Sequence, residues 1–140
     1  MLRTILAIPL IAVAALGAAG FARANDAQDA SSNGSVTPLL TQALTGIEGK
    51  EVSMVTVTYP PGGASAAHRH NADTFVYVLE GSVVMQVDGG APVTLTAGQT
   101  FHELPADVHR VSKNASDTKP AKILAILVKD QGAPATLPVK

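Results

Sequence analysis

The stretch GGASAAHRH (residues 62–70) carries the clearest structural and chemical signal in this sequence. In an extended strand, side chains at positions i and i+2 point to the same face, so His68 and His70 would lie side by side. Two imidazoles placed in this way can share one metal ion. The two remaining histidines, His102 and His109, follow in the same half of the chain, and none precedes the stretch. This clustering indicates a site.

The residues on both sides of this stretch alternate in the manner of β-strands. Residues 51–59 (EVSMVTVTY) place β-branched side chains on both faces, and the PPGG sequence at residues 60–63 ends the run. Further strands are expected at residues 74–79, 82–87, 93–96, 100–104, 109–112 and 121–128. Residues 36–46 fit either a short helix or an edge strand. Short strands with turns about every eight to twelve residues, and no long helix, predict an all-β sandwich or barrel.

The N-terminal residues 1–24 have the features of a secretory signal. Arg3 supplies a positive start, residues 5–16 are apolar, and Ala-Arg-Ala at residues 22–24 offers a cleavage site between small residues. The apolar run is shorter than the roughly 20 residues that span a bilayer, which disfavours the alternative of an uncleaved anchor. We therefore expect a periplasmic or secreted protein of bacterial type.

The rest of the chain is expected to contain a single globular domain. Residues 25–40 begin with a polar, Ala-rich segment without apolar periodicity, which predicts a flexible leader. The domain itself is expected over residues 41–135, followed by a tail over residues 136–140. A chain of this size can bury a core of its own.

The charge and composition of the chain indicate which kinds of partner are not expected. Signal removal would leave eight basic and eleven acidic residues, so the formal net charge would change from −1 to −3. This weakly acidic balance gives no reason to expect a nucleic acid, or a membrane after signal removal, as a partner. The absence of cysteine excludes disulfides and thiolate metal ligands.

The spacing of residues 62–81 resembles the first conserved motif of the cupin superfamily. The matching residues are Gly62, then His68 and His70 after five intervening residues, and then Gly81, eleven residues after the second histidine. The resemblance implies an all-β double-stranded β-helix, a jelly-roll barrel related to other two-sheet β folds.

A second motif of the same superfamily follows at the expected distance. Gly98, Pro105, His109 and Asn114 occur in the order that this motif has, although several of their spacings differ by one residue. The two motifs together cover residues 62–114, and the flanking strands extend the resemblance over most of the expected domain. The resemblance also suggests a homodimer.

The cupin resemblance implies a metal site formed by His68, His70 and His109. In the superfamily, a glutamate of the first motif completes the ligand set, but Thr74 stands at that position here. Threonine is a poor ligand for a divalent transition metal. Three neutral imidazoles suit iron, manganese, nickel, copper, cobalt or zinc, and the sequence does not select among these metals.

Three arrangements of the site remain open from the sequence. The three histidines can bind a metal alone, with open positions for water or substrate. A fourth ligand can come from elsewhere, with Glu103 as the first candidate and Asp73 and His102 behind it. The barrel can also serve as a metal-free pocket. Neighbours in a strand face opposite sides, so His102 would point outward if Glu103 points inward.

The leading functional hypothesis is a secreted metal-dependent enzyme that acts on a small organic molecule, with an oxygenase as one reaction class. Glu103 would then be a metal ligand or a catalytic general base beside the metal, since proton transfer requires a group within hydrogen-bonding distance. The alternative is a non-catalytic cupin that binds or senses a small ligand or a metal.

Overall fold

The computed structural model describes residues 33–139, which form eleven strands and no helix. The strands are β1 (Ser35–Ala43), β2 (Lys50–Tyr59), β3 (Ala64–Ser65), β4 (His68–Arg69), β5 (Ala72–Glu80), β6 (Ser82–Val87), β7 (Val93–Thr96), β8 (Thr100–Glu103), β9 (Val108–Asn114), β10 (Ala121–Asp130) and β11 (Leu137–Pro138). Within these residues no helix has the length and apolarity needed to cross a membrane. The predicted signal over residues 1–24 lies outside the described part of the chain.

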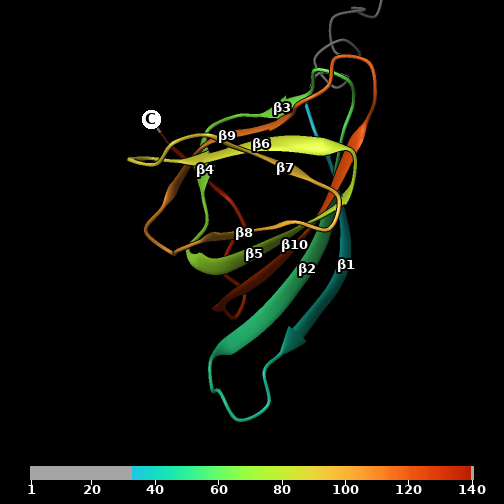
Figure 1. The fold of residues 1–140 in the computed structure, drawn as a ribbon. Helices are drawn as coiled ribbons and strands as arrows, with labels where there is room; N and C mark the ends of the chain where they lie inside the picture. The colour runs from blue at the N-terminus through green and yellow to red at the C-terminus, as the bar shows by residue number, and fades with distance from the viewer. Residues whose placement is uncertain (1–32, 140) are drawn as a thin grey trace, which may run out of the picture.

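Two antiparallel sheets face each other and enclose the interior (Figure 1). One sheet has the strand order β1-β2-β10-β5-β8, and the other has the order β11-β4-β9-β6-β7, with β3 also paired to β9. Several strands that are neighbours in space, such as β2 and β10, are far apart in the sequence. This arrangement arises because the chain passes back and forth between the two sheets. This topology confirms the predicted double-stranded β-helix.

Alternating side chains of β5 and β10 form the inner wall of the first sheet. Ile123 pairs with Val78 and Ala125 pairs with Val76, and all four side chains are buried. The main core cluster consists of Tyr59, Val76, Val78, Val83, Met85, Ala121 and Ile123. Burial of each large apolar side chain contributes about 1.5–3 kcal/mol to folding. The core therefore fixes the strands that carry the candidate site.

Residues 35–40, which the sequence assigns to the flexible leader, instead form the first part of β1. This strand pairs with β2 along its length, from Ser35 opposite Thr58 to Ala43 opposite Glu51. All nine β1 residues are exposed, so the strand is held by its backbone pairing with β2 and buries no apolar face. The adjacent Leu39 and Leu40 interrupt the alternation, at the register shift between Pro38 and Leu40. The structure resolves the choice between helix and edge strand in favour of the edge strand.

The C-terminal tail also contributes to the sheet. Within residues 136–140, Leu137 and Pro138 form β11 and pair with Arg69 and His68 of β4. The tail therefore lies beside the histidine stretch, although almost seventy residues separate them in the sequence. A two-residue strand is too short to produce a sequence pattern, so its pairing partner could not be predicted.

The tight turn between β5 and β6 explains the glycine that ends the first motif. Gly81 has a φ angle of +71°, a conformation that strongly favours glycine. A Cβ atom at this position would lie 2.5 Å from the carbonyl oxygen of Pro120. Gly81 therefore serves the fold, by allowing the turn to pack closely against the start of β10.

Candidate metal site

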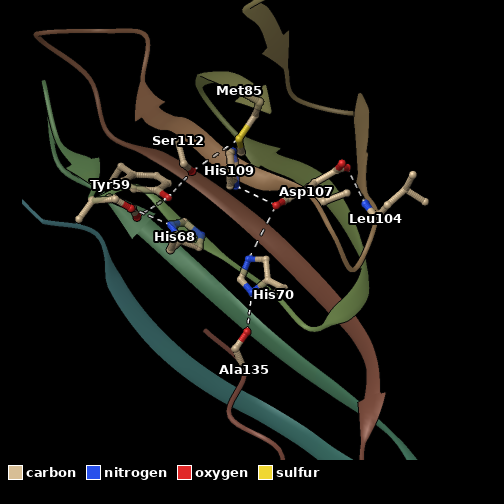
Figure 2. Close-up of polar contacts among 12 residues, drawn as sticks. Tyr59, His68, His70, Met85, Leu104, Asp107, His109, Ser112 and Ala135 are labelled. Atoms are coloured by element: carbon tan, nitrogen blue, oxygen red, sulfur yellow. Dashed lines mark hydrogen bonds and ion pairs between the residues drawn. The ribbon is translucent and has the colours of Figure 1, made fainter. Parts of the chain in front are cut away.

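The structure brings the three predicted histidine ligands together. His68 lies in β4, His70 follows that strand directly, and His109 lies in β9, opposite His68. One ring nitrogen of each histidine lies within 4.8 Å of the ligand nitrogens of the other two (Figure 2). Two nitrogens bound to the same ion at about 2.0–2.1 Å lie at most about 4.2 Å apart, so three imidazoles at this separation need only a small inward movement to share one ion.

A β-bulge turns His109 toward the interior. The pairing of β9 with β6 shifts register between Gln86 and Val87, so one extra residue, Arg110, is accommodated in β9 between His109 and Val111. The side chains of His109 and Ser112 are buried, whereas Arg110 is exposed. Bulges commonly redirect side chains beside binding sites.

Backbone carbonyl groups orient two of the rings. His68 Nδ1 lies 2.7 Å from the carbonyl oxygen of Ala66, and His70 Nδ1 contacts the carbonyl oxygen of Ala135 (Figure 2). A carbonyl oxygen only accepts hydrogen bonds, so each Nδ1 must donate. Each Nε2 is therefore left with a free lone pair for a metal. Burial lowers the pKa of His68 below its usual value, which favours this neutral form.

Glu103 supplies a carboxylate at the same place. It lies directly opposite Thr74 in the pairing of β8 with β5, and both side chains are almost fully buried. One carboxylate oxygen, Oε2, lies 3.0 Å from His109 Nδ1 and 3.9 Å from His70 Nε2. The cupin motif predicts a carboxylate at position 74 on β5, whereas the structure has one at position 103 on the neighbouring strand β8.

Unsatisfied polar atoms gather at this point. Among the described residues, the buried side-chain nitrogen and oxygen atoms without a hydrogen-bond partner are Thr74 Oγ1, Glu103 Oε2 and both ring nitrogens of His109. The 3.0 Å approach of Glu103 to His109 lacks hydrogen-bond geometry. A buried polar atom left unpaired costs about 1–3 kcal/mol, and more if it is charged. Imidazole nitrogens and a carboxylate oxygen are suitable ligands for a divalent transition metal, so the residues fit such an ion.

The other two candidates for a fourth ligand face away from the site. The His102 ring stacks on Phe75, with ring centroids 4.7 Å apart, and its Nε2 lies 3.4 Å from Asp73 Oδ1. The side chains of His102 and Asp73 are about half exposed, at 46% and 48%. The suggestions of Asp73 and His102 as ligands are therefore wrong. The predicted opposite orientation of His102 and Glu103 is confirmed.

A cavity of about 470 Å³ adjoins the three histidines. Thr74 and Glu103 line it together with the histidines, and the remaining walls are mostly apolar. Three residues of the C-terminal segment, Ala135, Thr136 and Pro138, also line it. Its size is within the range of about 300–1,000 Å³ that is usual for small-molecule sites.

Several residues of the site were missed by the sequence reasoning. Ala66 and Ala135 act through their carbonyl oxygens, which every residue has, so the sequence offers no signal for them. Tyr59, Ser65 and Ser112 line the same cavity and are hydrogen-bonded together. Ser65 lies within the GGASAAHRH stretch, and its position near the two histidines was the signal that could have identified it.

Comparison with known proteins identifies a family model and similar folds. A model described as a cupin domain matches residues 55–127. No curated protein matches the chain. Among solved structures, a cupin-like protein from Thermotoga maritima MSB8 is 22% identical, with a TM-score of 0.59 and coverage of 74% of both chains.

Two enzymes also have similar structures. The DMSP lyase DddQ from Ruegeria pomeroyi DSS-3 is 17% identical, with a TM-score of 0.59; the match covers 74% of this chain and 50% of the lyase. An oxalate oxidase in complex with the substrate analogue glycolate is 23% identical, also with a TM-score of 0.59, and the match covers 76% of this chain and 55% of the oxidase. The chain thus spans about half the length of these enzymes. At these identities the similarity shows the fold alone.

Proposed function

Because this chain belongs to the cupin domain family, we propose that it binds one divalent transition metal ion through His68, His70, His109 and Glu103. The observation that carries this proposal is the group of unsatisfied buried atoms on Glu103 and His109. A bound cation would give Glu103 Oε2 and one of the two His109 ring nitrogens a partner. Thr74 would then leave space beside the carboxylate and would not itself bind the metal.

The charge of the site supports a cation. Glu103 is 2% exposed, and its near neighbours with ionisable side chains are the histidines. A buried carboxylate without a compensating charge costs several kcal/mol. Neither lysine nor arginine is among the residues that line the cavity in the described part of the chain. A divalent ion would compensate the carboxylate, and together with three neutral imidazoles it would leave one net positive charge at the site.

A metal in this position would serve chemistry on a small organic molecule. The ion would act as a Lewis acid toward an oxygen atom of a molecule in the cavity, or bind dioxygen if it is iron or copper. Glu103 lines the cavity, so its carboxylate could also exchange a proton with a bound molecule. The named activities of two structural neighbours, a lyase and an oxidase, support an enzyme with a small substrate and leave the reaction open.

A non-catalytic binding or sensing role is the second candidate. Apart from the proposed ligands, Tyr59 is the one ionisable side chain among the described residues that line the cavity. Its hydroxyl group already contacts Ser65 and Ser112. The cavity is therefore poor in groups for proton transfer, which favours ligand binding without turnover. Activity of the metal-loaded protein on a broad substrate panel, absent in Glu103→Gln, would favour the enzyme.

We also propose that the protein is exported from the cytoplasm. Arg3, the apolar residues 5–16 and the cleavage site at residues 22–24 support a periplasmic or secreted location. Fractionation of cells that produce the full chain, with N-terminal sequencing of the mature protein, tests it. A mature N-terminus at Asn25 in the exported fraction is the expected result.

Metal analysis tests the proposed ligand set. Protein without a histidine tag is purified as wild type and as the variants His68→Ala, His109→Ala and Glu103→Gln, with His102→Ala as a matched control. We expect about one ion per chain in the wild type and in the control, and much less in the other variants. A wild type that binds no divalent metal overturns the proposal.

A further inference from the structure

Three hydroxyl groups form a connected chain in the wall of the cavity. Tyr59 is 1% exposed, and its hydroxyl oxygen lies 2.9 Å from Ser65 Oγ and 2.7 Å from Ser112 Oγ (Figure 2). Ser112 Oγ lies 3.5 Å from the sulfur of Met85. All three hydroxyl-bearing residues line the cavity that adjoins the histidines.

The sulfur of Met85 sets the direction of this chain. A thioether sulfur has no proton, so Ser112 must donate to it. The only proton of the Ser112 hydroxyl is then used, and Tyr59 must donate to Ser112. Ser65 must in turn donate to Tyr59. The chain therefore runs from Ser65 through Tyr59 and Ser112 to Met85, and Ser65 Oγ keeps its lone pairs as an acceptor at the free end.

The hydroxyl chain lies next to the proposed metal position along the same strands. Ser65 on β3 pairs with Ser112 on β9, and His68 on β4 pairs with His109, also on β9. The hydroxyl chain and the histidines therefore lie next to each other along β9. Three residues along a strand correspond to about 10 Å. One molecule of moderate size can therefore reach both the metal position and Ser65.

The walls between these two ends are apolar. Val55, Val57, Val76, Ile123 and Leu127 line the cavity. The lining residues of the described chain include no lysine or arginine that could hold a second anionic group. The only proposed positive charge is that of the metal. The cavity therefore suits a ligand with an apolar body and at most one anionic group.

We propose that Ser65, held by Tyr59, forms a subsite for a hydroxyl group of the ligand. The ligand would be a small, mostly apolar molecule that binds the metal through one oxygen group and donates its hydroxyl hydrogen to Ser65 Oγ. The metal-binding end of this ligand rests on the proposed function, whereas the hydroxyl subsite rests on the cavity alone.

Matched probe molecules test this subsite. Binding of 4-hydroxybenzoate, benzoate and terephthalate to the full-length mature protein is measured by calorimetry, and binding of phenol and toluene by nuclear magnetic resonance titration. We expect each hydroxylated probe to bind about three to ten times more tightly than its partner without the hydroxyl group, as one hydrogen bond would give. Terephthalate should bind more weakly than benzoate, because no cationic group of the cavity would pair with its second carboxylate.

Variants of the subsite and a control show which residue is responsible. Ser65→Ala should abolish the preference for the hydroxylated probes, and Tyr59→Phe should reduce it, because Ser65 loses its partner. Ser53→Ala is the control, since Ser53 is buried in the same barrel and does not line the cavity. Thermal melting confirms that each variant is folded. Equal binding of both members of each pair by the wild type, or an unchanged preference in both variants, overturns the inference.

Metal analysis of the same samples separates this inference from the proposed function. Phenol and toluene have no carboxylate group, so their comparison does not require a metal. A wild type that holds its metal but binds both members of each probe pair equally contradicts the subsite alone. A metal-free wild type that still prefers phenol in a Ser65-dependent manner contradicts the proposed function and supports the subsite.

Discussion

Thr74 and Glu103 lie directly opposite each other on the neighbouring strands β5 and β8, and both side chains face the interior. The Cβ atoms of such a cross-strand pair are about 4.5–5.5 Å apart. A longer side chain on either strand can therefore reach the same region of the barrel. This relationship explains how a cupin with threonine at the expected glutamate position can still place a carboxylate beside His70 and His109.

An exchange of these two residues should preserve metal binding. Glu103→Thr should lower metal affinity by at least about 100-fold, since even outer-sphere partners contribute about 10- to 100-fold. The double variant Thr74→Glu/Glu103→Thr returns the carboxylate to β5 and should recover much of this loss. Competition titration with a chelator measures both affinities. A double variant no better than Glu103→Thr would show that the carboxylate acts only from β8.

The C-terminal segment should be needed for metal affinity. The carbonyl oxygen of Ala135 accepts a hydrogen bond from His70, and β11 pairs with the strand that carries His68. Deletion of residues 133–140 should therefore weaken metal binding by about 10- to 100-fold, as the loss of an outer-sphere partner does. Deletion of residues 139–140 is the control and should have little effect. Equal affinities of the two truncated proteins would exclude an orienting role for the segment.

The ion pair between Glu51 and Lys129 should make stability depend on pH. Lys129 is 6% exposed and contacts Glu51, which lowers the pKa of the Glu51 carboxyl below its usual value of 4.5. The folded protein therefore binds this proton less readily than the unfolded chain. The stabilisation is present above pH 4.5 and is lost as the pH falls through the lowered pKa.

Glu51→Gln should accordingly reduce the free energy of unfolding at neutral pH and flatten its decline at acidic pH. Urea denaturation at a series of pH values measures this. Asp130→Asn removes the exposed pair of Asp130 with Lys50 and is the matched control, with a smaller effect expected because solvent screens that pair. A larger loss in Asp130→Asn than in Glu51→Gln would contradict the expected order.

Asn114, the last residue of the second cupin motif, should stabilise the fold without binding the metal. Its side-chain amide donates to the carbonyl oxygens of Pro60 and Lys119 at 2.9 and 2.7 Å, and its Oδ1 accepts from the Ser116 backbone. Asn114→Ala should cost about 2–4 kcal/mol, as the loss of three hydrogen bonds would. Denaturation and metal analysis are measured together, with exposed Asn71→Ala as the control. A loss of metal from folded Asn114→Ala would contradict this role.

The parts of the structure that could be predicted from the sequence were those with a local pattern. The alternation in residues 51–59, the apolar run in residues 121–128 and the two cupin motifs that contain His68, His70 and His109 correctly predicted the strands, the barrel and the histidine cluster. Alternation also predicted that His102 and Glu103 face opposite sides. Apart from the grouping of His109 with the other two histidines, which came from the second cupin motif, these predictions depend on residues close together in the sequence.

The features that could not be predicted depend on contacts between distant segments. β1 buries no apolar face, and Leu39 and Leu40 interrupt its alternation at a register shift against β2. The carbonyl oxygen of Ala135 reaches His70 only because the tail returns to the barrel. The register that pairs Thr74 with Glu103 is set by strand pairing across the sheet. The sequence could name Glu103 as a candidate, but it could not show that this residue lies opposite the missing ligand.

The most direct test of the proposed metal site is X-ray absorption spectroscopy of the untagged protein and its Glu103→Thr variant, together with elemental analysis. We predict about one divalent ion per chain in the wild type, bound by three imidazole nitrogens and a carboxylate oxygen, and loss of that oxygen ligand in the variant. A wild type without metal, or a metal whose ligands are identical in the two proteins, would contradict the assignment of Glu103 as the fourth ligand.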